Sequence, residues 1–270
     1  MNLLKTEWLK LKKYPAFWLI MGLTALSYPG VNFIFQNIYY EETHRKGQTG
    51  QLLQILMGNP FKIPEAWHTI AYSSSIFVFI PAVVVIMFIS NEYTYKTNRQ
   101  NIIDGWSRNQ FMFAKMLDVL MVTLLVTLLY IIITVIINFT NPANPFASAW
   151  DQSYYIPLFT LQTFAQLSIA FLVGYLVRKA FISLGIFVFY FLILENVLVG
   201  WLSYKKIGVY KYLPLEISDR LIPPPAFFRN LNPEGYKQEL AEINYHVLYT
   251  IILTAVIWLI CFRVNSRRDL

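Results

Sequence analysis

The chain has few charged residues and a single cysteine. Only 14% of its 270 residues are charged, and 56% are hydrophobic, whereas a soluble domain carries about 25% charged residues. This deficit indicates that lipid, rather than water, surrounds much of the folded chain. The one cysteine, Cys261, lies inside an apolar run, so we expect neither a disulfide framework nor a cysteine-based metal site.

Motifs for catalysis and nucleotide binding are also missing. The sequence has no GxxxxGK(S/T) loop to cradle ATP phosphates, no HExxH and no GxSxG. Paired glutamates in Glu-Glu-Thr-His-Arg at 41–45 are better interpreted as a solvated charge run than as part of an intramembrane protease. We therefore expect no enzyme, no metal site and no directly bound cofactor. The net charge of +7 comes from basic residues at the ends of apolar runs, which favours membrane topology over a nucleic-acid partner.

Apolar runs long enough to cross a bilayer recur along the chain. A spanning helix needs about 20 apolar residues, and only a helix satisfies its own backbone groups in lipid. The sequence predicts an all-α integral membrane protein, with Pro15, Pro29 and Pro81 kinking the first two spans. Its six predicted spans are 14–38, 69–90, 112–139, 154–177, 181–200 and 246–262.

Lysine and arginine are distributed unevenly between the two sets of connections. Thirteen of the 22 lie in the leader 1–13, the connection 91–115, the turn 178–180 and the tail 263–270. Cytoplasmic loops carry the excess of basic residues. We therefore expect cytoplasmic N- and C-termini, with 39–68, 140–153 and 201–245 outside. The chain then divides into a leader 1–13, a six-span membrane domain 14–262 and a basic cytoplasmic tail 263–270.

The two ends of this arrangement carry helix signals. Leu4, Trp8 and Leu11 share one face at helical spacing, which predicts an amphipathic helix in the membrane interface, although an ordinary basic anchor fits as well. In the external segment 201–245, a Pro-Pro-Pro break is followed by Asn232 as a helix N-cap and Pro233 as the first helical residue. That helix either continues into the last span or breaks near Asn244.

Polar residues inside the spans are candidates for function. Glu195 lies 14 residues into the fifth span, where a carboxylate faces protein, water or a partner, or is protonated. It either lines a substrate path or hydrogen-bonds a neighbouring helix or the external segment. Gln162 and Gln166 share one helix face and either bind helices together or line a pathway. Asp118 is expected to pair with Lys115, three residues earlier.

The connection 91–113 is too long and too patterned to be a simple linker. Its Ile102, Ile103 and Trp106 are apolar residues in a polar setting, and Asp104-Gly105 interrupts helix-compatible sequence. Ser107 to Gln110 forms a capping-box pattern that starts the next helix. The sequence predicts a helix, a sharp turn and a second helix, with apolar residues exposed near the tip. Such exposed residues are typical of a docking surface for another protein.

This connection resembles that of the permease subunits of ABC-2 class ATP-binding-cassette exporters, and the resemblance extends to the whole six-span topology. The matching positions are Glu92, Thr97, Arg99, Ile102, Ile103, Ser107, Arg108, Phe111 and Lys115. The chain departs from the pattern at Gly105-Trp106, where a proline-containing dipeptide is common, and at Lys96, where many members have glycine. The compact size is similar to that of permeases for bacteriocin or antibiotic self-protection.

The resemblance implies a function that needs partners. It implies a bacterial plasma-membrane protein that pairs with a second permease subunit and with two ATPase subunits, which bind the ATP and Mg²⁺. The implied ATPase-coupling residues are Glu92, Thr97, Arg99, Ile102, Ile103, Gly105, Trp106, Ser107 and Arg108, with Arg178 and Lys179 as a second contact. Gln162, Gln166 and Glu195 are the candidate substrate pathway. The alternative is an ATP-independent membrane protein, either a secondary transporter or a scaffold, although the inverted repeats frequent in secondary transporters are not found.

Overall fold

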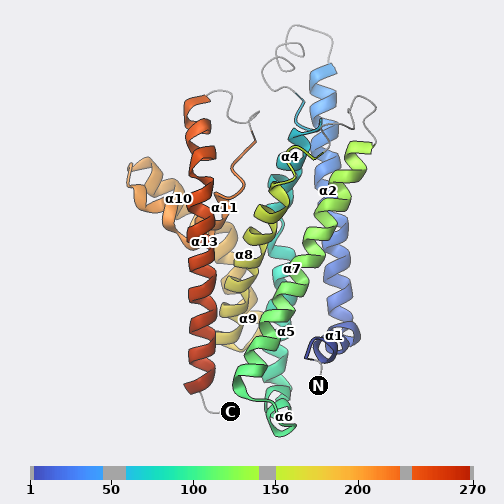
Figure 1. Ribbon diagram of the computed structural model, residues 1–270, viewed down its shortest axis with the longest axis vertical. Helices are drawn as coiled ribbons and strands as arrows, with labels where there is room; N and C mark the ends of the chain where they lie inside the picture. The colour runs from blue at the N-terminus through green and yellow to red at the C-terminus, as the bar shows by residue number, and fades with distance from the viewer. Residues whose placement is uncertain (1–2, 45–58, 140–149, 226–232, 268–270) are drawn as a thin grey trace.

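The computed structural model describes residues 3–44, 59–139, 150–225 and 233–267, and within these residues every regular element is a helix (Figure 1). The N-terminal half contains α1 (Leu3–Lys13), α2 (Pro15–His44), α4 (Glu65–Ser75), α5 (Phe79–Thr94), α6 (Thr97–Ile103) and α7 (Arg108–Phe139). The C-terminal half contains α8 (Tyr155–Val177), α9 (Ala180–Phe189), the π-helix η2 (Tyr190–Leu194), α10 (Glu195–Tyr204), the 3₁₀-helix η3 (Gly208–Tyr212), α11 (Pro214–Asp219) and α13 (Pro233–Arg267).

The predicted membrane-spanning architecture is confirmed in outline. Four single helices, α2, α7, α8 and α13, and the continuous helix through α9, η2 and α10 are long and apolar enough to cross a membrane. The pair α4 and α5 makes a sixth candidate span, bent by 48°. The break lies at 76–78 and not at Pro81, which falls in the first turn of α5, where a missing backbone N–H costs little.

Helix α8 is at the centre of the bundle. It packs against α4, α5, α7, α9, α11 and α13. A Cβ atom at Gly174 would lie 2.7 Å from the side chain of Ile89 and 3.3 Å from the Cα of Ile86, so α8 and α5 approach too closely for a larger residue. The outer faces of α2 and α13 expose residues such as Leu26 and Leu259, as helices in contact with lipid do.

Helix α1 begins, and α13 ends, at the same end of the bundle as α6 (Figure 1). Helix α1 turns its Glu7 and Leu11 inward, while Lys5, Lys12 and Lys13 are exposed. Helix α13 starts at Pro233, as predicted, and continues through Asn244 without a break. It also includes 263–267 of the predicted tail. The predicted N-cap, Asn232, lies outside the described residues.

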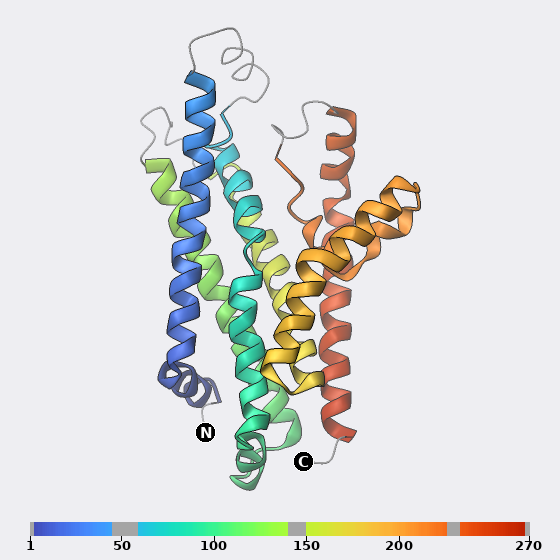
Figure 2. The ribbon, with the colours of Figure 1, turned by 180° about the vertical axis from the view of Figure 1, so that it is seen from behind.

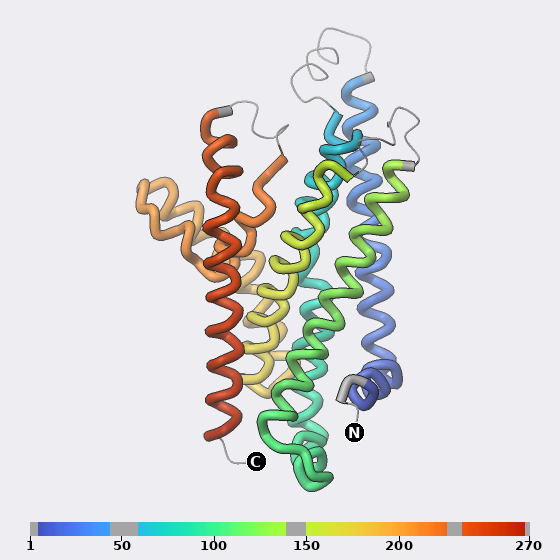
Figure 3. Tube along the Cα trace, in the orientation of Figure 1, coloured from blue at the N-terminus to red at the C-terminus, as the bar shows by residue number. Residues whose placement is uncertain are grey.

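The predicted external segment 201–245 is not a separate surface lobe. Helix α10 continues to Tyr204 and leans away from the bundle (Figure 2). The chain then returns through η3 to α11, which packs against α8 and α13 (Figure 3). Leu215, Leu221 and Ile222 are buried there. The returning segment is therefore part of the hydrophobic core of the bundle.

Candidate functional sites: a coupling loop and a polar cavity

The backbone of the 91–113 connection has the predicted helix, turn and helix. Gly105 adopts a positive φ of 96°, which glycine tolerates best, and the N–H of Trp106 donates to the carbonyl of Asn101 at 3.0 Å. The capping box is confirmed, because the Ser107 N–H donates to Gln110 Oε1 at 2.9 Å and the Gln110 N–H donates to Ser107 Oγ at 3.1 Å. Helix α7 starts at Arg108, directly after Ser107.

The tip of this loop exposes apolar surface, but less of it than the sequence predicted. Ile103 is 83% exposed, Arg99 is also exposed, and Ile102 is half-buried. Trp106 was predicted to be exposed at the tip, and this prediction is wrong. Its side chain is 7% exposed and packs against Phe111 and Ala114. The turn at Gly105 reverses the chain and returns the indole to the protein, so Trp106 anchors the loop.

Arg108, an implied ATPase-coupling residue, contacts the end of α13. Its Nη1 donates to the carbonyl of Ser266 at 2.9 Å and to that of Asn265 at 3.4 Å. In return, the side-chain amide of Asn265 donates to the carbonyl of Arg108 at 2.7 Å. The last carbonyls of a helix lack partners within the helix and carry partial negative charge. The guanidinium of Arg108 supplies both N–H donors for these carbonyls and a positive charge, so Arg108 links α7 to α13.

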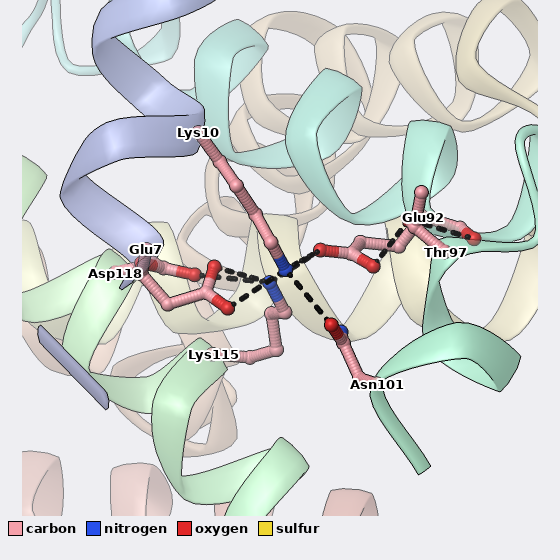
Figure 4. Close-up of polar contacts among 7 residues, drawn as sticks. All are labelled: Glu7, Lys10, Glu92, Thr97, Asn101, Lys115 and Asp118. Atoms are coloured by element: carbon pink, nitrogen blue, oxygen red, sulfur yellow. Dashed lines mark hydrogen bonds and ion pairs between the residues drawn. The ribbon is translucent and has the colours of Figure 1, made fainter. Parts of the chain in front are cut away.

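Glu92, which the resemblance implies is an ATPase-coupling residue, is buried at the base of the loop (Figure 4). Its Oε1 accepts hydrogen bonds from Lys115 Nζ at 2.7 Å and Lys10 Nζ at 3.1 Å. Its Oε2 accepts one from Thr97 Oγ1 at 2.6 Å. Glu92 and Thr97 therefore fasten α6 to α5. A coupling role for either residue stays a prediction.

Glu7, Lys10, Glu92, Lys115 and Asp118 together form what we call the charge cluster (Figure 4). Lys115 is fully buried, with its Nζ at 2.6 Å from Glu7, 2.7 Å from Glu92 and 3.3 Å from Asp118. The predicted Lys115–Asp118 pair is thus confirmed, within a network that the sequence did not predict. One signal was available, because Glu7 is the single acid among the lysines of 1–13 and lies one turn before Leu11.

The charge cluster joins three helices and contacts a fourth, α6. Glu7 and Lys10 come from α1, Glu92 from α5, and Lys115 and Asp118 from α7. The ammonium of Lys10 also lies 3.4 Å from Asn101 Oδ1 on α6 and 5.7 Å from the ring centre of Trp106. Burying ions costs desolvation energy, but removing one partner from such a network costs more, because it leaves an uncompensated charge. The arrangement therefore fixes the loop relative to α1, α5 and α7.

The second predicted coupling contact, at Arg178 and Lys179, lies in the turn between α8 and α9. Arg178 has a positive φ of 60°, and its guanidinium lies 4.4 Å from the ring centre of Tyr93 on α5. Lys179 is exposed. A role for this turn in binding a partner stays a prediction.

The candidate pathway residues meet α11. The side-chain amides of Gln162 and Gln166 both donate to Asp219 Oδ1, at 2.8 and 2.7 Å, so the predicted shared face is confirmed. Glu195 Oε1 accepts from the backbone N–H groups of Leu215 at 2.7 Å and Glu216 at 2.8 Å. These N–H groups lie in the first turn of α11 and have no partner within that helix. Of the two roles predicted for Glu195, the hydrogen bond to the segment 201–245 is the one that these contacts match.

Gln162, Glu195 and Asp219 line a cavity of about 380 Å³, which we call the polar cavity. Its polar lining includes Gln162, Glu195, Glu216, Asp219, Arg220, Glu239, Glu242 and His246. Burial, and then the neighbouring Glu216 carboxylate, raise the pKa of Asp219 to about 7. Asp219 was missed by the sequence interpretation, because nothing in the proline-rich stretch around it has helical periodicity. Within the described ranges no group of histidine, cysteine and acidic residues is suited to holding a metal ion.

Apolar helices of spanning length, a buried charge cluster and a polar cavity between helices define a multi-pass helical membrane protein. Residues 62–270 match the family described as "Protein of unknown function (DUF2705)", and the chain belongs to that family. No curated protein matches the sequence. The matched range includes the 91–113 connection and every residue that lines the polar cavity, but not α1 and its Glu7 and Lys10.

Proposed function

We propose that the chain is the transmembrane permease subunit of an ABC-2 type exporter of a bacterial plasma membrane. It would form the substrate pathway with a second permease subunit and couple to two separate ATPase subunits through 91–113. The observation that carries the proposal is Ile103, an aliphatic side chain that is 83% exposed at the tip of a rigidly held turn. An apolar residue presented in this way is suited to a groove on a partner.

The base of the loop supports a coupling role. Through Thr97, Asn101 and Trp106, the loop contacts Glu92 and Lys10 of the charge cluster. A displacement of α6 would therefore act on α1, α5 and α7 together, because the ion pairs of the charge cluster hold these three helices to one another. This is the mechanical requirement for a part that converts ATPase closure into movement of the spans.

The distribution of basic residues supports the orientation of the proposal. Helix α6, the start of α1 and the end of α13 lie at one end (Figure 1), and this end has most of the basic residues outside the spans. Basic residues concentrate on the cytoplasmic side. That end would accordingly face the cytosolic ATPase subunits.

The test is capture of an ATPase subunit. Wild-type chain, purified in mild detergent from its own cells, should retain a subunit with a Walker motif. Ile103→Asp should reduce this capture at least tenfold, equal to about 1.4 kcal/mol, because it places a charge in an apolar groove. Ile103→Val keeps the apolar contact and should bind nearly as wild type.

Both variants should melt at the wild-type temperature, since Ile103 makes little contact within the chain. Failure of the wild type to retain any ATPase would contradict the proposal. So would undiminished capture by a correctly folded Ile103→Asp protein. Either result would favour the ATP-independent alternative, a secondary transporter or a membrane scaffold.

A further inference from the structure

The lining of the polar cavity has an excess of negative charge. Five carboxyl groups line it, and Arg220 is the one lysine or arginine among the described lining residues. Glu216 pairs with Arg220 at 2.8 Å, and Glu242 pairs with Lys211 at 2.8 Å. In the part of the chain that the structure describes, Glu195 and Asp219 make no ion pair. Their hydrogen bonds come from neutral groups, namely glutamine side-chain amides, backbone N–H groups and the Tyr190 hydroxyl.

A second observation points to a ligand with donor groups. Gln162 lines the cavity and is only 1% exposed, yet its Oε1 has no hydrogen-bond partner. Its amide nitrogen is oriented by Asp219, so the oxygen is the atom left over. An unsatisfied buried acceptor costs about 1–3 kcal/mol. A ligand that donates a hydrogen bond would remove this cost.

The size and the apolar walls of the cavity narrow the class of ligand. A volume of about 380 Å³ lies within the range of about 300–1,000 Å³ typical of small-molecule sites. Ile76, Phe191, Leu192 and Val199 supply apolar surface in the same cavity. The acidic side chains do not converge on a point that would hold a metal ion in the described residues. An organic molecule with a positive charge, N–H donors and apolar surface matches both the acidic and the apolar residues of the lining.

We propose that the polar cavity binds an organic cation, with Asp219 and Glu195 facing its charge, Gln162 Oε1 accepting from its N–H group and Phe191 contacting its apolar body. The inference rests on the proposed function in one respect, since it makes this cation the exported substrate. Binding itself requires no ATPase. The two proposals can therefore fail separately.

Ethidium is a suitable probe, because it combines a permanent positive charge, aromatic rings and two amino groups. Its binding to wild-type protein in zwitterionic lipid nanodiscs is measured by fluorescence anisotropy, with empty nanodiscs as the blank. We expect saturable binding that Asp219→Asn and Glu195→Gln each weaken at least tenfold. Asp151→Asn removes the same charge at an exposed position outside the cavity and should leave the Kd unchanged. Both cavity variants retain an oxygen acceptor for their existing donors, and their melting temperatures check the fold.

The charge of ethidium does not change with pH, so its binding also reports the ionisation of the site. Binding should tighten between pH 6 and 8 as Asp219, whose pKa is about 7, loses its proton. Deprotonation of any facing carboxyl group or of His246 acts in the same direction, because each makes the cavity more negative. The titratable and charged groups that line the cavity with Asp219 are Tyr72 from α4, Glu195 from α10, Glu216 from α11, Arg220 directly after α11, and Glu239, Glu242 and His246 from α13. Lys211 from η3 pairs with Glu242. Asp219→Asn should reduce the pH dependence.

The outcomes separate the two proposals. Absence of saturable ethidium binding, or equal affinity in the wild type and both folded cavity variants, would overturn the inference while leaving ATPase capture to decide the permease function. Charge-dependent binding without any ATPase capture would support the cation site and point to ATP-independent transport.

Discussion

The charge cluster and the polar cavity both bury carboxylates among apolar helices, but they satisfy them in different ways. In the charge cluster, one ammonium lies within 3.3 Å of three carboxylates. Beside Lys115 there is a void of only about 10 Å³, at the lower limit of about 10–15 Å³ that one water molecule needs. In the polar cavity, Asp219 and Glu195 are held by neutral donors and face about 380 Å³ of space. Close-packed ion pairs fix a structure, whereas neutral donors beside an open space leave negative charge available to a ligand.

Removing the buried lysine should produce the largest effect, because it makes the charge cluster resemble the cavity. Lys115→Met fills a similar volume but leaves Glu7, Glu92 and Asp118 buried without their central cation. We expect a loss of about 3–5 kcal/mol in stability, measured as a lower melting temperature in detergent and loss of monodisperse protein. Lys10→Met is the matched control, since Lys10 is 29% exposed, and should cost less than about 1 kcal/mol. Equal losses in the two variants would show that burial of Lys115 is not what makes the cluster important.

Removing the Trp106 side chain, which packs beside the charge cluster, should have the next largest effect on stability. Trp106→Ala removes the packing against Phe111 and Ala114, at a cost of about 3 kcal/mol, and takes away the ring beside Lys10. The loss should be local, so trypsin should cleave after Lys96 and Arg99 faster than in the wild type. Trp106→Phe retains most of the contact and serves as the control. Unchanged cleavage of Trp106→Ala would mean that the indole does not anchor the loop.

The smallest effect on stability is expected at Glu195, where two roles can be separated. Glu195→Leu removes the acceptor for two N–H groups of α11 and should cost about 2 kcal/mol. Glu195→Gln keeps an acceptor and should melt within a few degrees of the wild type, although it loses the charge that ethidium binding needs. A glutamine variant as unstable as the leucine variant would show that the charge itself holds α11, and the contrast between cluster and cavity would fail.

Local signals in the sequence predicted the structure well where local physics decides it. Apolar length predicted the long helices, and the capping box at Ser107 and Gln110 predicted the start of α7. The α4–α5 break also had a local signal, because Ser73 and Ser75 return hydrogen bonds to the carbonyls of Thr69 and Tyr72. Such bonds compete with helix geometry.

The sequence could not predict the contacts of residues whose environment depends on distant parts of the chain. Trp106 is apolar in a polar stretch whether it packs inward or outward, and only the fold decides which. The partners of Arg108 are 157 and 158 residues away in sequence. Asp219 gained its environment from Gln162 and Gln166 on α8, at separations of 57 and 53 residues. Periodicity along one helix contains no information about such pairings.

The π-helix η2 has a consequence for how α10 meets the cavity. The buried positions of this long helix, Ser183, Phe187 and Glu195, are separated by multiples of four residues. In a regular α-helix each step of four turns about 40° too far, so Glu195 would lie about 120° from the face of Ser183. The wider turn of η2, immediately before Glu195, reduces this drift. The helix therefore behaves as if one residue had been inserted, and deleting a single residue between 190 and 194 would rotate the rest of α10 and turn its carboxylate away from α11.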